Sequence, residues 1–367
     1  MTPLFGHLVG RIARDGPLTV AQFMEEALGN KDHGYYITRD PLGARGDFTT
    51  SPEISQVFGE LLGLWCASVW ESLGSPDTFR WVEMGPGRGT LMADAVRATR
   101  KVGDFHAAAN IHLIETSPVL MDRQREALAA EGFATCGWHR DLSQIPDGPV
   151  ICIANEFFDA LPVRQFQRVL GGWRERLVDL NEDKNGLRFI LSDQDTKPHF
   201  IPDSVRHAPD ENMGQSLIET SPMGMRVMHT LSDRLIQSGG AALIIDYGHA
   251  VTAVGETLQA VQDHKFTDVL DNPGEQDLTA HVDFGALRLV AQDAGATCSP
   301  VMEQGTFLNA LGVSVRAKQL ADAASSFEQG QDVAARIDRL VNPDQMGQLF
   351  KVMGVSPSEL APLPGLG

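Results

Sequence analysis

The sequence predicts an α/β protein with a Rossmann-like core, in which parallel strands alternate with helices. An apolar run at 80–84 is followed by a glycine-rich turn at 85–89 and a helical pattern from about residue 90. The runs 149–155 and 240–245 are apolar without interruption, which is typical of parallel strands buried on both faces. A polar residue follows each predicted strand, at the edge where open α/β sheets bind ligands.

Composition excludes several classes of protein. Apolar residues make up 43% of the chain and charged residues 21%, and no apolar run reaches the length of a membrane span. The net charge of −18 repels polyanions, so we expect neither a nucleic-acid nor a membrane partner, whereas a basic protein or peptide is permitted. The four cysteines form no C-x-x-C pair, so we expect reduced thiols and no metal site.

The first 75 residues are expected to form an N-terminal helical cap with a cofactor-covering loop. Leu4, Leu8 and Ile12 follow helical spacing, and Thr19 begins a second helix that runs to Leu28. The loop at 34–52 is rich in small and polar residues but carries three aromatic side chains. A long loop in a compact protein is often functional. A helix at 53–73 then leads into the core.

The Rossmann-like core is expected over 76–162 and 239–305. Its strands are predicted, in chain order, at 80–84, 110–115, 133–138, 149–155 and 240–245. Helices are predicted at 89–101, from Ser117-Pro118 onward, and at 283–294, with a strand near 297–303. The Ser-Pro pair suits a helix start, because serine caps the first turn and proline fits its first position.

About 80 residues separate the fourth and fifth strands, far more than one crossover helix needs. Within this insert, 163–238, apolar and polar residues alternate around the turns Gly171-Gly172 and Asn185-Gly186. Such turns predict an antiparallel meander, and a helix is expected at 221–237. We interpret the insert as a substrate-side subdomain. The remainder, 306–367, is expected to form C-terminal helices as far as about residue 353.

The glycine turn and the acid before it favour S-adenosyl-L-methionine (SAM) as the ligand. Gly85, Gly87 and Gly89, with Pro86 between them, follow the spacing Gly-x-Gly-x-Gly, whereas the dinucleotide fingerprint is Gly-x-Gly-x-x-Gly. Glu83 stands two residues earlier. SAM carries a cationic ammonium and a sulfonium, so an adjacent acid suits it better than a pyrophosphate. A glycine-rich turn in some other α/β protein is the alternative interpretation.

Two further strand ends supply residues for the rest of this ligand. Glu115, followed by Thr116, stands 26 positions after Gly89, where an acid is expected to bind two ribose hydroxyls. Asp141 and Leu142 follow the third strand and are expected to border the adenine. The alternative is that these acids simply cap the helices that follow them.

The run Asn155-Glu156-Phe157-Phe158-Asp159 is the candidate catalytic segment. In a helical turn, Glu156 and Asp159 would share one face, and two carboxylates can orient a guanidinium through bidentate contacts. A plain helix start with acids near its dipole is the alternative. Asn155 and Phe158 are also spaced as in the loop of amino-group nucleic-acid methyltransferases, but that loop's two prolines are missing. His281 is expected to be a core or capping residue rather than a metal ligand.

Together these segments resemble the MidA family of SAM-dependent methyltransferases, and the resemblance runs from about residue 4 to about residue 316. Five runs carry it: Gly46–Glu60, Glu83–Thr90, Asn155–Pro162, Asp246–Gly248 and Asp277–Phe284. Mitochondrial members of this family assist the assembly of respiratory complex I by symmetrically dimethylating an arginine of a core subunit. The better-known arginine methyltransferases carry two glutamates in a hairpin, whereas this chain offers Glu156 and Asp159.

The resemblance implies that the loop at 46–53, and with it Thr50, Ser51 and Pro52, covers the cofactor. It also implies that Asn155 and Glu156 lie beside the methyl group and that the partner is an arginine-bearing protein, of which a complex I subunit is one example. The N-terminus lacks the features of a signal or transit peptide, so we expect a bacterial cytoplasm, or the mitochondrial matrix in a eukaryote. A homodimer is compatible with the sequence.

Two other functions remain open at this stage. One is a small-molecule or nucleic-acid methyltransferase, and the other is a non-catalytic SAM-binding assembly factor. The carboxylates at 83, 115 and 156 argue against the non-catalytic alternative.

Overall fold

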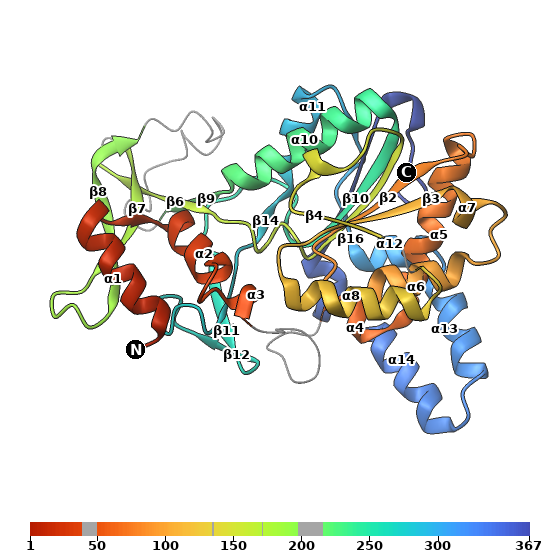
Figure 1. The fold of residues 1–367 in the computed structure, drawn as a ribbon, viewed down its shortest axis with the longest axis horizontal. Coiled ribbons are helices and arrows are strands. Elements are labelled where there is room, and N and C mark those ends of the chain that lie inside the picture. Colours follow the sequence, from red (N-terminus) through yellow and green to blue (C-terminus); the bar gives the residue numbers. More distant parts are fainter. Residues whose placement is uncertain (39–49, 134–135, 171, 197–215) are drawn as a thin grey trace.

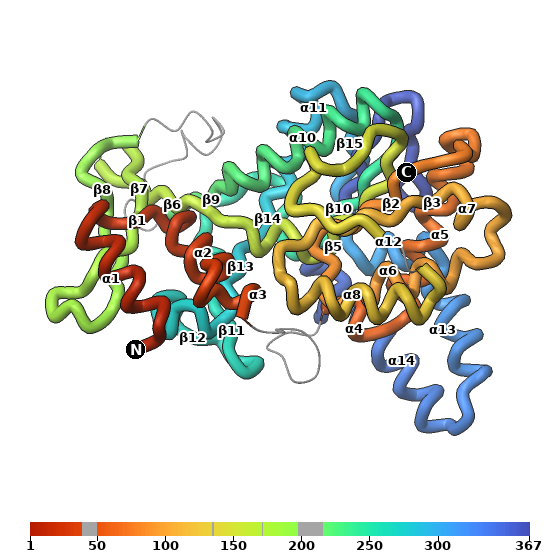
Figure 2. Tube along the Cα trace, viewed as in Figure 1, coloured from red at the N-terminus to blue at the C-terminus, as the bar shows by residue number. Residues whose placement is uncertain are grey.

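The computed structural model describes residues 1–38, 50–133, 136–170, 172–196 and 216–367. Figure 1 shows a larger lobe built around a central sheet and a smaller lobe built from antiparallel strands and the N-terminal helices. The smaller lobe combines segments that lie far apart in sequence, as the colours of the tube in Figure 2 show. Much of the loop expected at 34–52 lies outside the described residues.

The central sheet confirms the predicted parallel core. Its main strands are β2 (Phe79–Met84), β3 (Ala109–Ile114), β4 (Gly137–His139), β5 (Val150–Asn155), β10 (Gly240–His249) and β17 (Phe350–Ser356). They lie in the order β17-β10-β5-β2-β3-β4, and every neighbouring pair is parallel except β10 and β17. The third predicted strand is shorter than expected and begins at Gly137.

Helices cover both faces of this sheet. Ile151 and Ile153 of β5 pack in one core with the helices α5 (Gln56–Ser72) and α6 (Thr90–Thr99). The alternate residues Val150 and Cys152 face a second core with α10 (Pro222–Ser238) and α11 (Phe284–Asp293). Because side chains alternate along a strand, unbroken apolar runs are what a sheet covered on both faces requires. Within the described residues, no helix is long and apolar enough to cross a membrane.

Further helices complete the larger lobe: α4 (Ser51–Ile54), α7 (Phe105–Ala108), α8 (Pro118–Ala130), η1 (Leu142–Gln144), α12 (Gln304–Ala310), α13 (Val313–Asp322), α14 (Phe327–Val341), η3 (Pro343–Gly347) and η4 (Ser358–Leu360). The start of α8 confirms the expected cap, because the Ser117 side chain accepts a hydrogen bond from the Leu120 amide and Pro118 follows at the first helical position.

The prediction of helices to about residue 353 is wrong at its end, because 350–356 form the strand β17. This strand pairs with the outer edge of β10, with Asp246 opposite Lys351. Without a neighbour on this side, the edge of β10 would expose unpaired backbone N–H and C=O groups. β17 forms hydrogen bonds with these groups, and this long-range pairing was not predicted from the sequence. The strand expected near 297–303 is split into β15 (Thr297–Cys298) and β16 (Met302–Glu303), both antiparallel to β17.

The smaller lobe contains the expected antiparallel meander. Its sheet comprises β1 (Leu18–Thr19), β6 (Arg164–Val169), β7 (Gly172–Leu180), β8 (Leu187–Thr196) and β9 (Leu217–Thr220). The helices α1 (Pro3–Asp15) and α2 (Val20–Gly29) pack on this sheet, and Phe23 and Val178 belong to one core cluster. Residues 1–75 therefore serve both lobes, because α1 and α2 join the smaller lobe whereas α5 packs in the larger one.

A three-stranded sheet after β10 was not predicted. It consists of β11 (Gln259–Gln262), β12 (Lys265–Thr267) and β13 (Asp277–Thr279). The next strand, β14 (Val282–Asp283), pairs in parallel with the end of β10. The short helix α3 (Tyr35–Thr38) follows α2. The Ala280 amide donates to the Asp159 carbonyl at 3.0 Å, so this sheet is joined to the segment that follows β5.

Candidate active site

A cavity of about 1060 Å³ opens at the carboxyl ends of β2, β3 and β5 and extends to the smaller lobe. Its lining includes most of the predicted site residues: Thr50, Pro52, Glu83, Gly85, Pro86, Gly87, Glu115, Thr116, Asp141, Leu142, Asn155, Glu156 and Asp159. Gly89 and Ser51 do not line it. The structure therefore brings together side chains from 50–52 and from four strand ends that lie far apart in sequence.

The glycine turn adopts a backbone that other residues rarely accept. Gly85, Gly87 and Gly89 have φ values of 65°, 53° and 83°, all in the left-handed region. A Cβ on Gly85 would lie 3.0 Å from the ring of Phe157, and one on Gly89 would lie 3.1 Å from the Cα of Gln124. Gly89 is thus required for packing at the start of α6, whereas Gly85 and Gly87 present backbone to the cavity.

Glu83 is a buried acid at the base of this turn. Its side chain is 3% exposed, and its Oε2 has no hydrogen-bond partner within the described part of the chain. Burial raises its pKa to about 8. A buried carboxyl oxygen without a partner is costly unless a ligand supplies a donor, so this position suits the ammonium of a methionyl group.

Glu115 is held in a fixed orientation at the end of β3. Its Oε1 accepts the amides of Thr116 and Ser117 at 2.7 and 2.8 Å, and its Oε2 accepts the Gln124 amide at 3.1 Å. Burial raises its pKa. A carboxylate has about four acceptor positions, so it keeps capacity for the two hydroxyls of a ribose.

Gln124 is a site-supporting residue that sequence reasoning missed. Its side-chain amide donates to the Gly87 carbonyl at 2.7 Å, and its oxygen accepts the Trp138 indole N–H at 2.8 Å. It therefore links the glycine turn, Glu115 and β4. A glutamine inside α8 carries no sequence signal of this role, because its partners are brought to it by folding.

Asp141 caps the helix that follows it, as the alternative interpretation expected. Its side chain accepts a hydrogen bond from the Ser143 amide at 2.8 Å, in the first turn of η1. It also lines the cavity together with the buried side chain of Leu142. The capping bond fixes the backbone at the place where an adenine ring is expected. Capping and ligand binding are therefore compatible here.

Glu156 lines the cavity at the carboxyl end of β5. Its Oε1 accepts the Ser51 amide at 2.8 Å and the Asn155 side-chain amide at 3.1 Å. Burial, followed by the nearby Asp159, raises its pKa to about 7, although the Ser51 and Asn155 bonds oppose this. The expected helical turn is wrong, because Glu156 has a φ of 50° and no helix forms between it and Pro162.

Asp246 shapes the turn after Glu156. Its Oδ2 accepts the amides of Phe157, Phe158 and Asp159 at 3.2, 3.0 and 3.3 Å. This fully buried carboxylate replaces the helical hydrogen bonds that the segment lacks. Asp159 is 6% exposed, and burial raises its pKa to about 6. Sequence reasoning recognised Asp246 as a polar strand end but gave it no role.

The residues at 50–54 contact the site from the side of α5. The Ser51 amide binds Glu156, as described above, and the Thr90 hydroxyl donates to Glu53. The loop end is therefore attached both to the catalytic segment and to the start of α6. The rest of the loop expected to cover the cofactor, 39–49, lies outside the described residues.

The smaller lobe lines the far side of the cavity with residues that sequence reasoning missed. They include Met24, Leu28, Tyr36, Asp277 and Thr279, and α10 contributes Met223, Arg226, Val227 and Thr230. No described residue of β6, β7, β8 or β9 lines it. Among its described residues, the insert therefore reaches the cavity through α10 rather than through its sheet.

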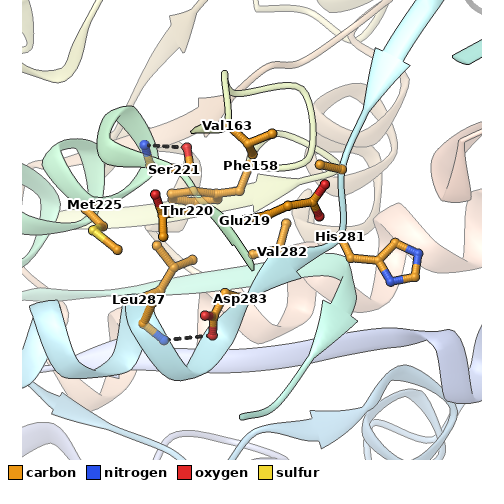
Figure 3. A pocket seen from close by; sticks show the side chains of 13 residues that line it. Phe158, Val163, Glu219, Thr220, Ser221, Met225, His281, Val282, Asp283 and Leu287 are labelled. Carbon is orange, nitrogen blue, oxygen red and sulfur yellow. Dashed lines mark hydrogen bonds between the residues drawn. The ribbon is translucent and has the colours of Figure 1, made fainter. Parts of the chain in front are cut away.

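A second hollow, beside Phe158, is too small for a substrate. It measures about 30 Å³, room for water alone. Figure 3 shows that its wall includes Ser221 and Asp283, whose side chains accept amide hydrogen bonds in the first turns of α10 and α11. These polar side chains are therefore occupied as helix caps, and the large cavity is the candidate site for the cofactor.

The comparisons with known proteins agree with this geometry. Residues 61–302 match a family described as "Putative S-adenosyl-L-methionine-dependent methyltransferase". The chain is 41% identical to the Mus musculus "Protein arginine methyltransferase NDUFAF7, mitochondrial", over 98% of this chain and 85% of that protein. The Homo sapiens protein of the same name is 39% identical over 98% and 84%.

A solved structure shares the whole fold. It is a Burkholderia thailandensis protein bound to S-adenosyl-homocysteine, with a TM-score of 0.81, 27% identity, and coverage of 99% of this chain and 92% of that one. The family match spans the glycine turn, Glu115 and Glu156, and the relatives cover almost the entire chain. This chain therefore belongs to the MidA family of S-adenosyl-L-methionine-dependent methyltransferases.

Proposed function

We propose that this methyltransferase modifies a guanidinium nitrogen of an arginine in a protein substrate. The observation that carries the proposal is the pair of acids Glu156 and Asp159, buried at the reacting end of the cavity. Within the described residues, no lysine or arginine forms an ion pair with either acid. A buried acidic pair without a cation favours a ligand that brings one. The names of the mouse and human relatives support the same acceptor.

The residues around the cavity divide into cofactor and acceptor groups. Glu83 and the backbone at 85–87 would hold the methionyl part of SAM, Glu115 the ribose, and Asp141 with Leu142 the adenine. When bound, SAM supplies an electrophilic methyl group on its sulfonium. All of these contacts follow from the same strand-end geometry, which is where the fold places a ligand.

On the acceptor side, Glu156 accepts N–H groups of the guanidinium and thereby fixes which nitrogen faces the methyl donor. Positioning of this kind contributes much of the rate in a transfer that needs little acid–base help. The nitrogen that gains a methyl group loses a proton. With a pKa of about 7, the Glu156 carboxylate is suited to receive that proton or pass it to solvent.

The proposal is tested by comparing Glu156→Gln with the native protein. The variant should still bind S-adenosyl-homocysteine, but transfer should fall by about 10²-fold or more, because the neutral amide loses the electrostatic hold on the guanidinium. A suitable control is Glu182→Gln, on an exposed turn of the smaller lobe. The assay follows labelled methyl from SAM into cell lysate, with mass spectrometry of the product.

The same assay separates the competing functions. Methyl groups on lysine, a nucleobase or a metabolite, with none on arginine, would contradict the proposed acceptor and leave the family assignment intact. Absence of any transfer despite binding would favour a non-catalytic assembly factor. We further propose that the target is a subunit of complex I. The enzyme would then act in the bacterial cytoplasm, or in the mitochondrial matrix of a eukaryote. The direct check is whether that subunit is methylated in the purified complex.

A further inference from the structure

Tyr36 and Asp277 form a hydrogen-bonded pair in the wall of the cavity. The Tyr36 hydroxyl donates to the Oδ1 of Asp277 at 2.8 Å. Tyr36 belongs to α3 and Asp277 is the first residue of β13, and both line the cavity together with Glu156 and Asp159. No contact with the cofactor is needed to explain either residue.

The carboxylates of Asp277 and Asp159 both act on the Tyr36 hydroxyl. Burial, followed by these two acids, raises the pKa of Tyr36 well above its usual value. The Ala280 amide, just after β13, donates to the Asp159 carbonyl at 3.0 Å. The strand that carries Asp277 is therefore attached to the turn that carries Asp159, which fixes the two acids relative to each other.

Among the described residues, several buried polar atoms in residues that line the cavity have no partner of good geometry. They are the Oδ1 of Asp159, the Oδ1 of Asn155 and the hydroxyl of Tyr247, each in a residue that is 6% exposed. All three residues line the cavity. The Tyr247 hydroxyl interacts with the Asp159 carboxyl and with Thr279. The carboxyl and amide oxygens of Asp159 and Asn155 keep capacity to accept further hydrogen bonds, which suits a ligand that supplies donors.

A guanidinium meets this requirement better than an ammonium does. It is planar and offers five N–H donors in a fixed arrangement, so it can contact carboxylates on more than one side at once. Glu156, on the cofactor side, accounts for one edge of such a group. Asp159 and Asp277 face it from elements that the cofactor does not use.

We propose that Asp277, oriented by Tyr36, and Asp159 form a specificity subsite that binds the guanidinium edge left free by Glu156. The acceptor arginine is then held between the two lobes, with one nitrogen directed at the methyl donor. This assignment rests on the proposed function, because it presumes an arginine acceptor. It makes Asp277 a specificity-determining residue and Tyr36 a positioning residue.

The test measures binding of two matched probes to the protein saturated with S-adenosyl-homocysteine. N-acetyl-arginine methylamide carries a guanidinium, whereas N-acetyl-citrulline methylamide has nearly the same shape with a neutral urea. Asp277→Asn keeps the size of the side chain and an acceptor for Tyr36 but removes the charge. Asp271→Asn, on the exposed turn before β13, is the control.

The native protein should prefer the arginine probe, and Asp277→Asn should reduce that preference by about 10-fold or more, since a charge-assisted hydrogen bond is lost. The affinity for S-adenosyl-homocysteine should stay unchanged, and Asp271→Asn should behave as the native protein. Tyr36→Phe should weaken the preference less, because Asp277 keeps its charge but loses its orientation. In turnover, both variants should raise KM for an arginine peptide.

The outcomes distinguish the two proposals. If the native protein prefers arginine and both variants keep that preference in full, the pair is a structural latch between α3 and β13, and this inference is overturned while the proposed function stands. If the native protein shows no preference for arginine over citrulline, both are overturned. If Asp277→Asn does not fold, Tyr36→Phe decides the question alone, because it removes one hydroxyl and no charge.

Discussion

Glu156 combines a left-handed backbone with a buried carboxylate. A φ of 50° costs a residue with a Cβ roughly 1 kcal/mol or more, so the surrounding structure must compensate. The Glu156 amide donates to the Ile245 carbonyl at 2.9 Å, and Asp246 accepts the next three amides. With this backbone, the Glu156 side chain lines the cavity.

The pH profile of transfer should report this carboxylate. The pKa values of Glu156 and Asp159 are raised to about 7 and about 6, chiefly by burial. The proposed function requires the ionised forms, because these bind a guanidinium. The ratio kcat/KM for the acceptor reflects the free enzyme, so it should rise with pH towards about 7 and level off above. For Glu156→Gln, the rise of kcat/KM near pH 7 should be absent. A profile that is flat between pH 5.5 and 8 would contradict this role.

Glu115 should govern affinity for the cofactor. Replacing it with alanine removes two charge-assisted hydrogen bonds to the ribose, each worth roughly 1.5–3 kcal/mol, so the Kd for S-adenosyl-homocysteine should rise by at least ~10²-fold. Calorimetry measures this directly. Glu126→Ala, on an exposed turn of α8, is the matched control. Equal affinities for the two variants would remove Glu115 from the site.

At the scale of elements, the segment before α5 joins the cofactor edge to the catalytic turn. Ser51 binds Glu156, Glu53 accepts the Thr90 hydroxyl, and Arg336 of α14 donates to the Ile54 carbonyl at 3.0 Å. These contacts fix the end of the loop. A loop held at its end beside a cavity is suited to close over a ligand and exclude water.

We therefore expect the loop at 34–56 to close over the cofactor. Amide hydrogen exchange across these residues should slow when S-adenosyl-homocysteine binds, because closure shields their backbone from solvent. Peptides from β8, which contributes nothing to the cavity, should exchange at the same rate in both states. Unchanged exchange throughout 34–56 would show that the loop is a rigid connection rather than a lid.

At the scale of the whole molecule, buried acids make stability depend on pH. Glu83 and Glu156 have folded-state pKa values of about 8 and about 7, above the usual 4.5. The folded state therefore binds more protons than the unfolded state, and this stabilising contribution is lost as pH rises through those values. Histidines such as His112, whose pKa is lowered to about 4, oppose this trend chiefly below about pH 6.5, where an unfolded histidine is mostly protonated.

The free energy of unfolding of the ligand-free protein should consequently fall between pH 6.5 and 8, by up to about 1.4 kcal/mol per pH unit for each group that titrates. Denaturant titrations at the two pH values measure this difference. Glu83→Gln should flatten the slope, and S-adenosyl-homocysteine should stabilise more at pH 8, because its ammonium favours ionised Glu83. Stability that rises over this window would contradict the assignment.

The sequence by itself determined the parallel core, the glycine turn and most of the cofactor edge. Apolar runs of strand length and a Gly-x-Gly-x-Gly turn are local features that the sequence displays directly. The carboxyl ends of parallel strands lie at the same edge of the sheet, independently of the loops that follow them. Glu83, Glu115, Asn155 and Glu156 could be placed for that reason. The match of several motifs in one order also indicated the family before any geometry was known.

The tertiary structure decided the acceptor side of the cavity and the edge of the sheet. Gln124, Asp246 and the pair Tyr36–Asp277 act through partners between 9 and 241 positions away in sequence, so no local pattern marks them. The strand β17 likewise forms because β10 offers an unpaired edge, not because its residues require a strand. Hydrogen bonds and strand pairs of this kind join segments that are distant in sequence. They depend on how those segments pack in the folded chain, so the sequence of a single segment does not predict them.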